Sequence, residues 1–588
     1  MQIVQKTNGR SMKRVLLSSA LLLVSTLTFA QSKVSGTVKD ANGEPLIGVS
    51  VMEVGTNNGA VTDINGNYTL NVKPGAKLKL SYIGFTPQTV KAGSNSQIVL
   101  QEDNTALNEV VVVGYGTMRR KDVTSSITTV KAEDLNQGVF TDPGQMLQGK
   151  VPGLVVSSTA DPNGSPTITL RGASTLRTGA MSPYYVVDGI PGVDISIVSP
   201  EDIESIDVLR DATATAIYGS KAANGVIIIT TKKGSKERTN VTYNGYVAID
   251  NILKKYDVCT ADDLRQYAKD NNITLKDGGA NTDWQDEVLR TGISHNHNVN
   301  ISGGNGSTNY MISGDLRKRE GVIKMTGFDR FNVRSLVSTK TLKDHLTVSL
   351  GANMMYGKHF GVPSGNEGAS VLDAMNYYSP TNAVKNADGT WTVGSGSKNY
   401  NPLALMEENK SETVWKRNQF VGKTALELWK GLVWNVNYSW SNYQSTYSAY
   451  NTRNSQLEGI GNKNGQATRN TYFGREQTFE TYLNYNFKAG KNKFDLMAGY
   501  SWEEKKNNDG FGLSVEGYYN DDLGWYNMSY AQTILGVQNS VQSGYLEKVR
   551  NISFYGRVNY SFDSRYMLQA TIRRDGSSVF GKNNRWGT

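Results

Sequence analysis

The sequence predicts a mainly β chain: an N-terminal β-sandwich, a mixed α+β domain, and the first half of a large antiparallel transmembrane β-barrel. Three observations support this prediction. Short β runs separated by turn residues come first, a compact segment that mixes strands with helical turns follows, and from residue 235 alternating strands are joined by connections of two unequal lengths. At 588 residues the chain exceeds the usual size of one domain, so several cores or one large barrel are expected.

Composition narrows the function classes. A mean hydropathy of -0.44 with 38% apolar residues excludes a bundle of transmembrane helices but suits barrel strands with one polar and one apolar face. The formal charge of +9 is not accompanied by a basic helix or a nucleic-acid motif, so a scattered solvated surface is favoured over nucleic-acid binding. Lipid phosphates of an outer leaflet are a further candidate partner for these basic side chains. Cys259 is the single cysteine, which excludes an intramolecular disulfide.

Residues 1–30 have the pattern of a secretory signal peptide. Lys13 and Arg14 precede an apolar segment at 15–29, and cleavage is expected between Ala30 and Gln31. Met12 is an alternative start of translation, which leaves the translation of residues 1–11 open.

Residues 31–103 predict the small β-sandwich. Turn pairs such as Asn42-Gly43, Asn65-Gly66 and Pro74-Gly75 separate its short β runs. The expected runs are 34–38, 49–54, 68–72, 78–82 and 97–100. Asp63, Asn65 and Asn67 suggest a calcium loop, but Pro74 stands where an EF-hand needs its glutamate, so ordinary turn chemistry is favoured. A linker at 104–120 follows, and its valine run 110–113 predicts a strand.

Residues 121–234 predict the mixed α+β domain. Tyr184 to Val187 reads as a strand that ends in a tight turn at Asp188-Gly189, and Ser199 to Asp202 reads as one capped helical turn before the strand 206–209. The β-branched run 226–231 predicts a fully buried strand.

Residues 235–588 predict the barrel strands. Val241, Tyr243, Gly245, Val247 and Ile249 share one face of the first strand, and similar alternation recurs in the strands that follow. Tight joints are expected near residues 305, 343, 430, 490 and 563, with long loops such as 251–294 and 360–412 between them. Short periplasmic turns and long extracellular loops alternate in this way in membrane barrels. About eleven strands precede Thr588, whereas barrels close with an even number, so further strands are expected beyond this chain.

Enzyme motifs are weak. Gly422-Lys423-Thr424 lacks the first glycine of a phosphate-binding loop, and the Ser-x-x-Lys motif at 395–398 stands in a polar loop without companion motifs. His295 and His297 share a strand face but lack further metal ligands, so solvated histidines are favoured. We therefore expect no enzyme activity, catalytic residue, metal or cofactor.

The run from Pro183 to Gly234 resembles the plug domain of SusC-like (SusC/RagA) TonB-dependent outer-membrane transporters. The likeness extends back through residues 147–153 and 167–172, and the stretches 43–49 and 62–68 resemble a carboxypeptidase-regulatory-like domain. The plug positions that carry the resemblance are Arg171, Gly172, Asp188, Gly189, Arg210, Asp211, Tyr218, Gly219, Asn224 and Gly225.

The resemblance implies TonB-dependent import of an oligomeric nutrient across the outer membrane. A glycan is the first expectation and a peptide the second, and an outer-membrane receptor that senses its ligand is the alternative. By the same resemblance Glu109, Val110, Val111, Val112 and Val113 correspond to the TonB box, which pairs with TonB as an added β-strand. A SusD-like surface lipoprotein is the expected partner. Trp391 and Tyr400, in a long loop, are candidates either for stacking on sugars or for an aromatic girdle.

Overall fold

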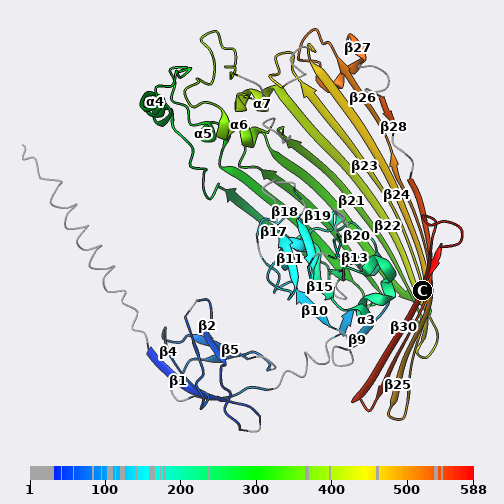
Figure 1. The fold of residues 1–588 in the computed structure, drawn as a ribbon. Coiled ribbons are helices and arrows are strands. Elements are labelled where there is room, and N and C mark those ends of the chain that lie inside the picture. The colour runs from blue at the N-terminus through cyan, green and yellow to red at the C-terminus, as the bar shows by residue number, and fades with distance from the viewer. Residues whose placement is uncertain are drawn as a thin grey trace, which may run out of the picture. The chain divides into compact units, whose positions relative to one another are not determined.

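The computed structural model describes most of the chain beyond residue 31 (Figure 1). The described residues are 32–101 without 42, 57, 83–84 and 94–95; 110–112; 114–119; 126–140 without 137; 142–157; 164; 166–172; 174–175; 181–234; 238–363; 370–395; 399–457; 463–534; 541–543; and 547–588. The expected signal peptide and its expected cleavage site at Ala30 and Gln31 lie outside these residues.

The first compact unit is a two-sheet sandwich, as the sequence predicts. One sheet has the order β4-β1-β7 and the other the order β3-β2-β5-β6. The strands are β1 (Ser32–Lys39), β2 (Ser50–Glu53), β3 (Gly59–Val61), β4 (Asn67–Val72), β5 (Lys77–Ser81), β6 (Gln88–Lys91) and β7 (Ser96–Val99). Alternate side chains such as Val38, Val51 and Leu80 are buried between the sheets. The Asp63 carboxylate accepts hydrogen bonds from the backbone N–H groups of Asn65 (2.9 Å) and Asn67 (2.8 Å), which is turn chemistry.

The mixed α+β domain, called the plug below (residues 126–234), has a five-stranded sheet of order β10-β15-β16-β13-β14. Its elements are β10 (Ile127–Lys131), η2 (Pro143–Leu147), β11 (Leu154–Ser157), β12 (Thr167–Leu170), β13 (Tyr184–Val187), β14 (Ile190–Pro191), η3 (Ile195–Ile197), η4 (Pro200–Asp202), β15 (Ile203–Leu209), α3 (Ala212–Thr215), η5 (Ala216–Ala222) and β16 (Val226–Thr231). The β-branched strand β16 lies buried between β13 and β15, as its composition predicts. The Ser199 hydroxyl does not cap η4, contrary to expectation, because it donates instead to the Glu201 carboxylate (2.7 Å).

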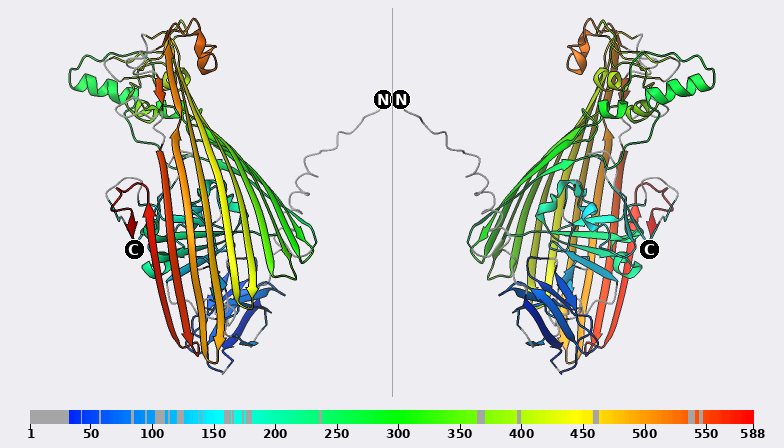
Figure 2. Two further views of the ribbon diagram at one scale, coloured as in Figure 1. Left: turned by 90° about the vertical axis from the view of Figure 1, so that its right-hand side faces the viewer. Right: turned by 90° about the vertical axis from the view of Figure 1, so that its left-hand side faces the viewer.

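The third part is a curved antiparallel sheet, called the wall below, which surrounds one side of the plug (Figures 1 and 2). Its long strands are β17 (Asn240–Asp250), β18 (Gly292–Gly304), β19 (Thr308–Glu320), β20 (Gly327–Thr341), β21 (Leu346–Gly361), β22 (Asn409–Trp429), β23 (Leu432–Asn451), β24 (Gln466–Ala489), β25 (Asn492–Asp509), β29 (Glu547–Phe562) and β30 (Tyr566–Ser577). Short strands β26 (Phe511–Glu516), β27 (Thr533–Ile534) and β28 (Val541–Ser543) extend it beyond β24, and β31 (Trp586–Gly587) pairs with β30.

Connections alternate in length along the wall as predicted. Tight turns join β18 to β19, β20 to β21, β22 to β23, β24 to β25 and β29 to β30, whereas longer segments make the other joins. The longest of these carry α4 (Ala261–Asp270), α5 (Trp284–Val288), α6 (Val371–Tyr377), α7 (Pro402–Glu408), η6 (Gly524–Tyr526) and η7 (Met528–Tyr530). In a membrane barrel the long-loop end is extracellular and the short-turn end periplasmic.

The polarity of the two faces of the wall is the reverse of that in a soluble protein, in which polar side chains lie outside and apolar side chains inside. Apolar side chains such as Val247, Leu350 and Ile572 are exposed on the outer face, whereas Asn298, Arg317 and Arg334 are buried on the face toward the plug. An outward apolar face with a polar interior is what lipid around a barrel requires.

Candidate functional site

The plug meets the wall through many polar and ionic contacts, beside an apolar cluster that joins Ile217 and Tyr218 to Met497 and Tyr555. Three acidic plug residues face three basic wall residues: Asp188 faces Arg334 of β20, Glu201 faces Arg317 of β19, and Asp194 faces Arg417 of β22. Polar contacts of this kind can be exchanged for water when two bodies separate, whereas a dry apolar interface would resist separation.

Asp188 is held by its own turn and then by the wall. Its φ of 49° and the φ of 79° at Gly189 form the predicted tight turn between β13 and β14. The carboxylate accepts hydrogen bonds from the backbone N–H (2.9 Å) and hydroxyl (2.7 Å) of Thr231, and from Arg334 Nη2 (2.9 Å). Lys423 of β22 donates to the Asp188 carbonyl oxygen. Asp188 therefore ties two plug strands to two wall strands.

A second group of contacts between the plug and the wall lies at η4. Arg317, 1% exposed, donates to both Glu201 carboxylate oxygens (3.0 and 3.2 Å) and to the Phe140 carbonyl oxygen. Beside it the Ser313 hydroxyl donates to the Asp202 carboxylate (2.7 Å). Burial raises the pKa of Asp202 above its usual value.

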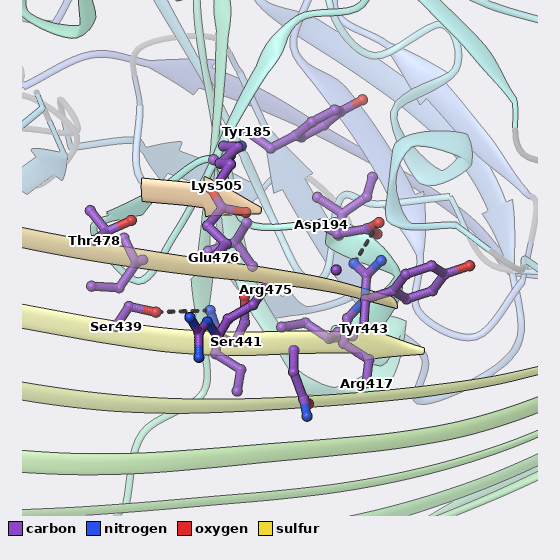
Figure 3. Close-up of a pocket in the computed structure, with 18 of the residues that line it drawn as sticks. Tyr185, Asp194, Arg417, Ser439, Ser441, Tyr443, Arg475, Glu476, Thr478 and Lys505 are labelled. Carbon is purple, nitrogen blue, oxygen red and sulfur yellow. Dashed lines mark hydrogen bonds and ion pairs between the residues drawn. The ribbon is translucent and has the colours of Figure 1, made fainter. Parts of the chain in front are cut away.

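A cavity of about 910 Å³ lies between the plug and β22 to β25, nearer the long-loop end (Figure 3). Hydroxyl, amide and aromatic groups contribute much of its lining, among them Ser439, Ser441, Tyr443, Thr478 and Asn507. This size and chemistry suit a bound polar oligomer.

Four charged groups of this cavity form two ion pairs, while Asp142 and Arg475 also belong to its lining. Arg417 contacts Asp194 at 2.5 Å and lies 4.7 Å from the centre of the Tyr443 ring, while Lys505 contacts Glu476 at 2.7 Å. Burial opposes ionisation of Asp194, but Arg417 and hydrogen bonds from Ser196 outweigh it and lower the pKa of that carboxyl. Asp142 has no comparable compensation, so burial raises its pKa to about 6.

Several of the plug positions that carry the family resemblance make contacts within the plug. Arg210 donates to the Pro152 carbonyl oxygen (3.2 Å) and the Ser126 hydroxyl (2.7 Å), and the Asp211 carboxylate caps α3 by accepting from Ala214 N–H (2.7 Å). These contacts join separate segments of the domain and are structural.

The remaining positions that carry the resemblance lie in turns or near the wall. Arg171 (φ 60°) and Gly172 (φ 89°) turn the chain after β12, and Gly225 (φ 89°) does so before β16. Asn224 donates to the Ser182 carbonyl oxygen (3.4 Å), and Gly219 has a φ of 71°. Tyr218 is buried near the wall, beside Tyr115.

The expected TonB box is described only in part. Val110–Val112 forms strand β8, which pairs with β9 (Thr117–Arg119), while Glu109 and Val113 lie outside the described residues. The coupling role of this segment remains a prediction.

The aromatic loop candidates differ from one another. Tyr400 is 8% exposed in the core that α5, α6 and α7 form, so the expectation that it stacks on a ligand or forms a girdle is wrong. Trp391 is half-buried with Lys385 Nζ 4.2 Å from its ring centre.

Two of the weak motifs fall in wall strands. His295 and His297 lie within β18 with ring centres 5.2 Å apart, and the Tyr243 hydroxyl is 2.7 Å from His297 Nδ1. Lys423 belongs to β22 and contacts the plug, as described above.

The sequence did not predict the role of three basic residues of the wall, Arg317, Arg334 and Arg417. The one feature of the sequence that could have indicated them is a charged residue on the polar face of a predicted strand.

Comparisons with known proteins agree with this geometry. A family model described as "TonB-dependent Receptor Plug Domain" matches residues 119–226, and one described as "CarboxypepD_reg-like domain" matches residues 34–112. TonB-dependent receptor SusC of Bacteroides thetaiotaomicron is 34% identical over 99% of this chain and 60% of its own. The chain is SusC-like.

Other relatives extend the comparison. TonB-dependent receptor P3 of Formosa agariphila is 33% identical over 98% of this chain and 58% of its own, so this SusC-like chain spans about 60% of the length of these relatives. The solved RagAB peptide importer in its open-open state superposes with a TM-score of 0.72 at 23% identity, covering 82% of this chain and 57% of that chain, which supports the fold.

The comparisons also bear on location and class. TonB-dependent receptors are outer-membrane proteins, in agreement with the expected location, and both SusC and P3 are named as receptors rather than enzymes. Within the described part of the chain, helices are too short or too polar to cross a membrane. Among the same residues, acidic, histidine and cysteine side chains form no group of three suited to a metal ion.

Proposed function

We propose that the protein imports an oligomeric nutrient across the outer membrane, driven by TonB, with a SusD-like surface lipoprotein as partner. The observation that carries this proposal is the set of ionic contacts between plug and wall at Asp188, Glu201 and Asp194. These contacts hold the plug in the resting state, yet they can be exchanged for water when the plug moves. TonB would supply the pull through Glu109–Val113, so the chain needs no nucleotide site.

The same proposal divides the chain by role. Residues 1–30 direct secretion, 31–103 form the carboxypeptidase-regulatory-like domain, and 104–120 hold the TonB box. Residues 121–234 form the plug, and 235–588 form barrel strands.

A glycan is the cargo that the cavity favours. Because Asp194 pairs with Arg417 and Glu476 pairs with Lys505, much of the charge is neutralised internally. Hydroxyl and amide groups then remain to bind a neutral polyhydroxylated ligand, and Tyr472 adds an aromatic ring to the lining.

A peptide is the second candidate, because the RagAB structures to which the fold is similar are named as those of a peptide importer. The backbone of a peptide offers amide groups that the same lining could bind. Growth experiments, rather than the fold, distinguish these two candidate cargoes.

The test is a strain that lacks the gene encoding this chain, grown on a panel of purified glycans and of peptide mixtures as sole carbon sources. We expect growth to fail on one class of glycan and to remain normal on its monosaccharide, and a strain without TonB should show the same failure. Failure on peptides alone would identify the second cargo, whereas unchanged growth on the whole panel would refute import by this protein.

A further inference from the structure

Tyr115 occupies the junction between the plug and the wall. It lies between β8 and β9, at the tip of the hairpin that these two strands form, and is 5% exposed. Its ring stacks on Tyr555 of β29, with centroids 4.7 Å apart and planes 13° apart. Two further rings surround it, Tyr482 of β24 at 5.2 Å and Tyr218 of the plug at 5.7 Å.

Polar contacts fix the same residue. The Tyr115 hydroxyl donates to the Glu480 carboxylate (2.7 Å), and the Tyr115 carbonyl oxygen accepts from Asn484 Nδ2 (3.3 Å). A side chain added at Gly114 would meet Ile217 Cγ2 at 2.9 Å, so the tip of the hairpin fits closely against η5. One residue next to the expected TonB box therefore contacts β24, β29 and the plug.

Three cavities succeed one another along β24, and Tyr115 separates the last two. The cavity described above shares Pro191 and Thr478 with a second cavity, which continues past Glu480 and is bounded on its other side by β29, β30 and β31. A third cavity, of about 470 Å³, begins at Gly114–Gly116 and reaches the short-turn end beside Asn309, Lys423 and Asn435. Among the residues that the structure describes, Tyr115 is the one that lines both the second and the third cavity.

We propose that Tyr115 is the gate of the transport path, and that a pull on β8 withdraws it from between Tyr218 and Tyr555 and so joins the cavities. This inference rests on the proposed TonB-dependent import and adds the route and the moving residue. The hairpin strands span three residues each, so few backbone hydrogen bonds hold the tip in place. The aromatic ring of Tyr115 closes the path. When the pull ends, the hydrogen bond from its hydroxyl to Glu480 forms again and restores the closed position.

The route fits the proposed cargo. Beyond the first cavity it is lined by Ser501, Ser349, Asn435 and Asn437, whose hydroxyl and amide groups can bind successive hydroxyls of a sugar chain. A path along β24 also leaves the core of the plug sheet in place, because β13, β15 and β16 need not separate from one another.

The first test uses potassium chloride as the probe, with the protein encoded by the gene purified from outer membranes and inserted into planar lipid bilayers. The gate predicts that Tyr115→Ala gives a steady KCl conductance that wild type lacks, while Tyr115→Phe stays sealed because its ring still fills the gap. A Tyr115→Ala protein as silent as wild type would overturn the gate, as would equal conductance in the two variants.

The second test does not depend on the stability of Tyr115→Ala. In a Cys259→Ser background, Gly114→Cys and Ile217→Cys place two thiols where a disulfide ties the hairpin tip to η5. Uptake of the nutrient found in the growth panel should stop in oxidised cells and return with a reductant, so the reduced form is its own control. Full uptake by the oxidised, cross-linked protein would overturn the gate. If the Cys259→Ser parent takes up nothing, the proposed import fails instead, and the conductance measurement still decides the gate.

Discussion

Replacing Asp188 by asparagine should loosen the plug in the wall by a predictable amount. The substitution keeps the size of the side chain and an oxygen that can accept from Thr231 N–H, but removes the charge that faces Arg334 and Lys423. Arg334 is only 7% exposed, so it would be left as a buried cation. The Asp188 side chain is 24% exposed, which reduces the penalty below that of a fully buried pair. We expect a cost of about 2 kcal/mol, or about 30-fold in the equilibrium for opening.

Hydrogen exchange at the backbone amide of Thr231, the last residue of β16, measures this opening, because that amide donates to the Asp188 carboxylate (2.9 Å) where the plug contacts the wall. Because the expected cost of about 2 kcal/mol corresponds to about 30-fold in the opening equilibrium, exchange should be about 30-fold faster in Asp188→Asn than in wild type. The matched control is Asp277→Asn, which breaks an exposed pair with Arg265 (2.7 Å) in a long loop and should change exchange in β16 little.

A double-mutant cycle assigns the effect to the pair. Arg334→Met removes the buried cation, so Asp188→Asn should cost much less in that background than alone. Strictly additive costs, or unchanged exchange in Asp188→Asn, would refute the reasoning that an ionic contact holds the plug.

Two further predictions concern the plug. Gly225→Ala should destabilise it by about 2 kcal/mol or more, since the new Cβ would lie 2.3 Å from Leu170 Cδ2. Gly149→Ala, also at positive φ but with open space around it, is the control, and equal losses of denaturation midpoint would contradict the packing argument. Burial raises the pKa of Asp142 to about 6, so the folded plug binds this proton more tightly than the unfolded chain does, and its stability should fall as pH rises from about 4 to 6. Asp142→Asn should flatten that slope in urea titrations, and an unaltered slope would reject the assignment.

Local chemistry made much of the fold predictable. Asp188-Gly189 between β-rich runs specifies its turn, the β-branched run 226–231 specifies a buried strand, and tight pairs such as Lys430-Gly431 specify hairpins. Each of these signals depends on neighbours within a few residues, which a single sequence contains.

The site could not be predicted in the same way. Asp188 and Arg334 are 146 residues apart, and Tyr115 and Glu480 are 365 apart, so their contacts depend on how the plug and wall assemble. The sequence pattern around Lys423 indicates only a weak phosphate-loop motif, although this lysine donates to the plug. A charge on the polar face of a strand shows that it points inward but does not identify its partner.

The most direct test of the central claim is deletion of Glu109–Val113 in the chromosomal gene, with surface binding and uptake of the identified nutrient measured on the same cells. Binding should stay at the wild-type level, because the cavity at the long-loop end is untouched, while uptake falls to that of a strain without TonB. Uptake at the wild-type rate after the deletion would contradict a plug that opens by a pull on this segment.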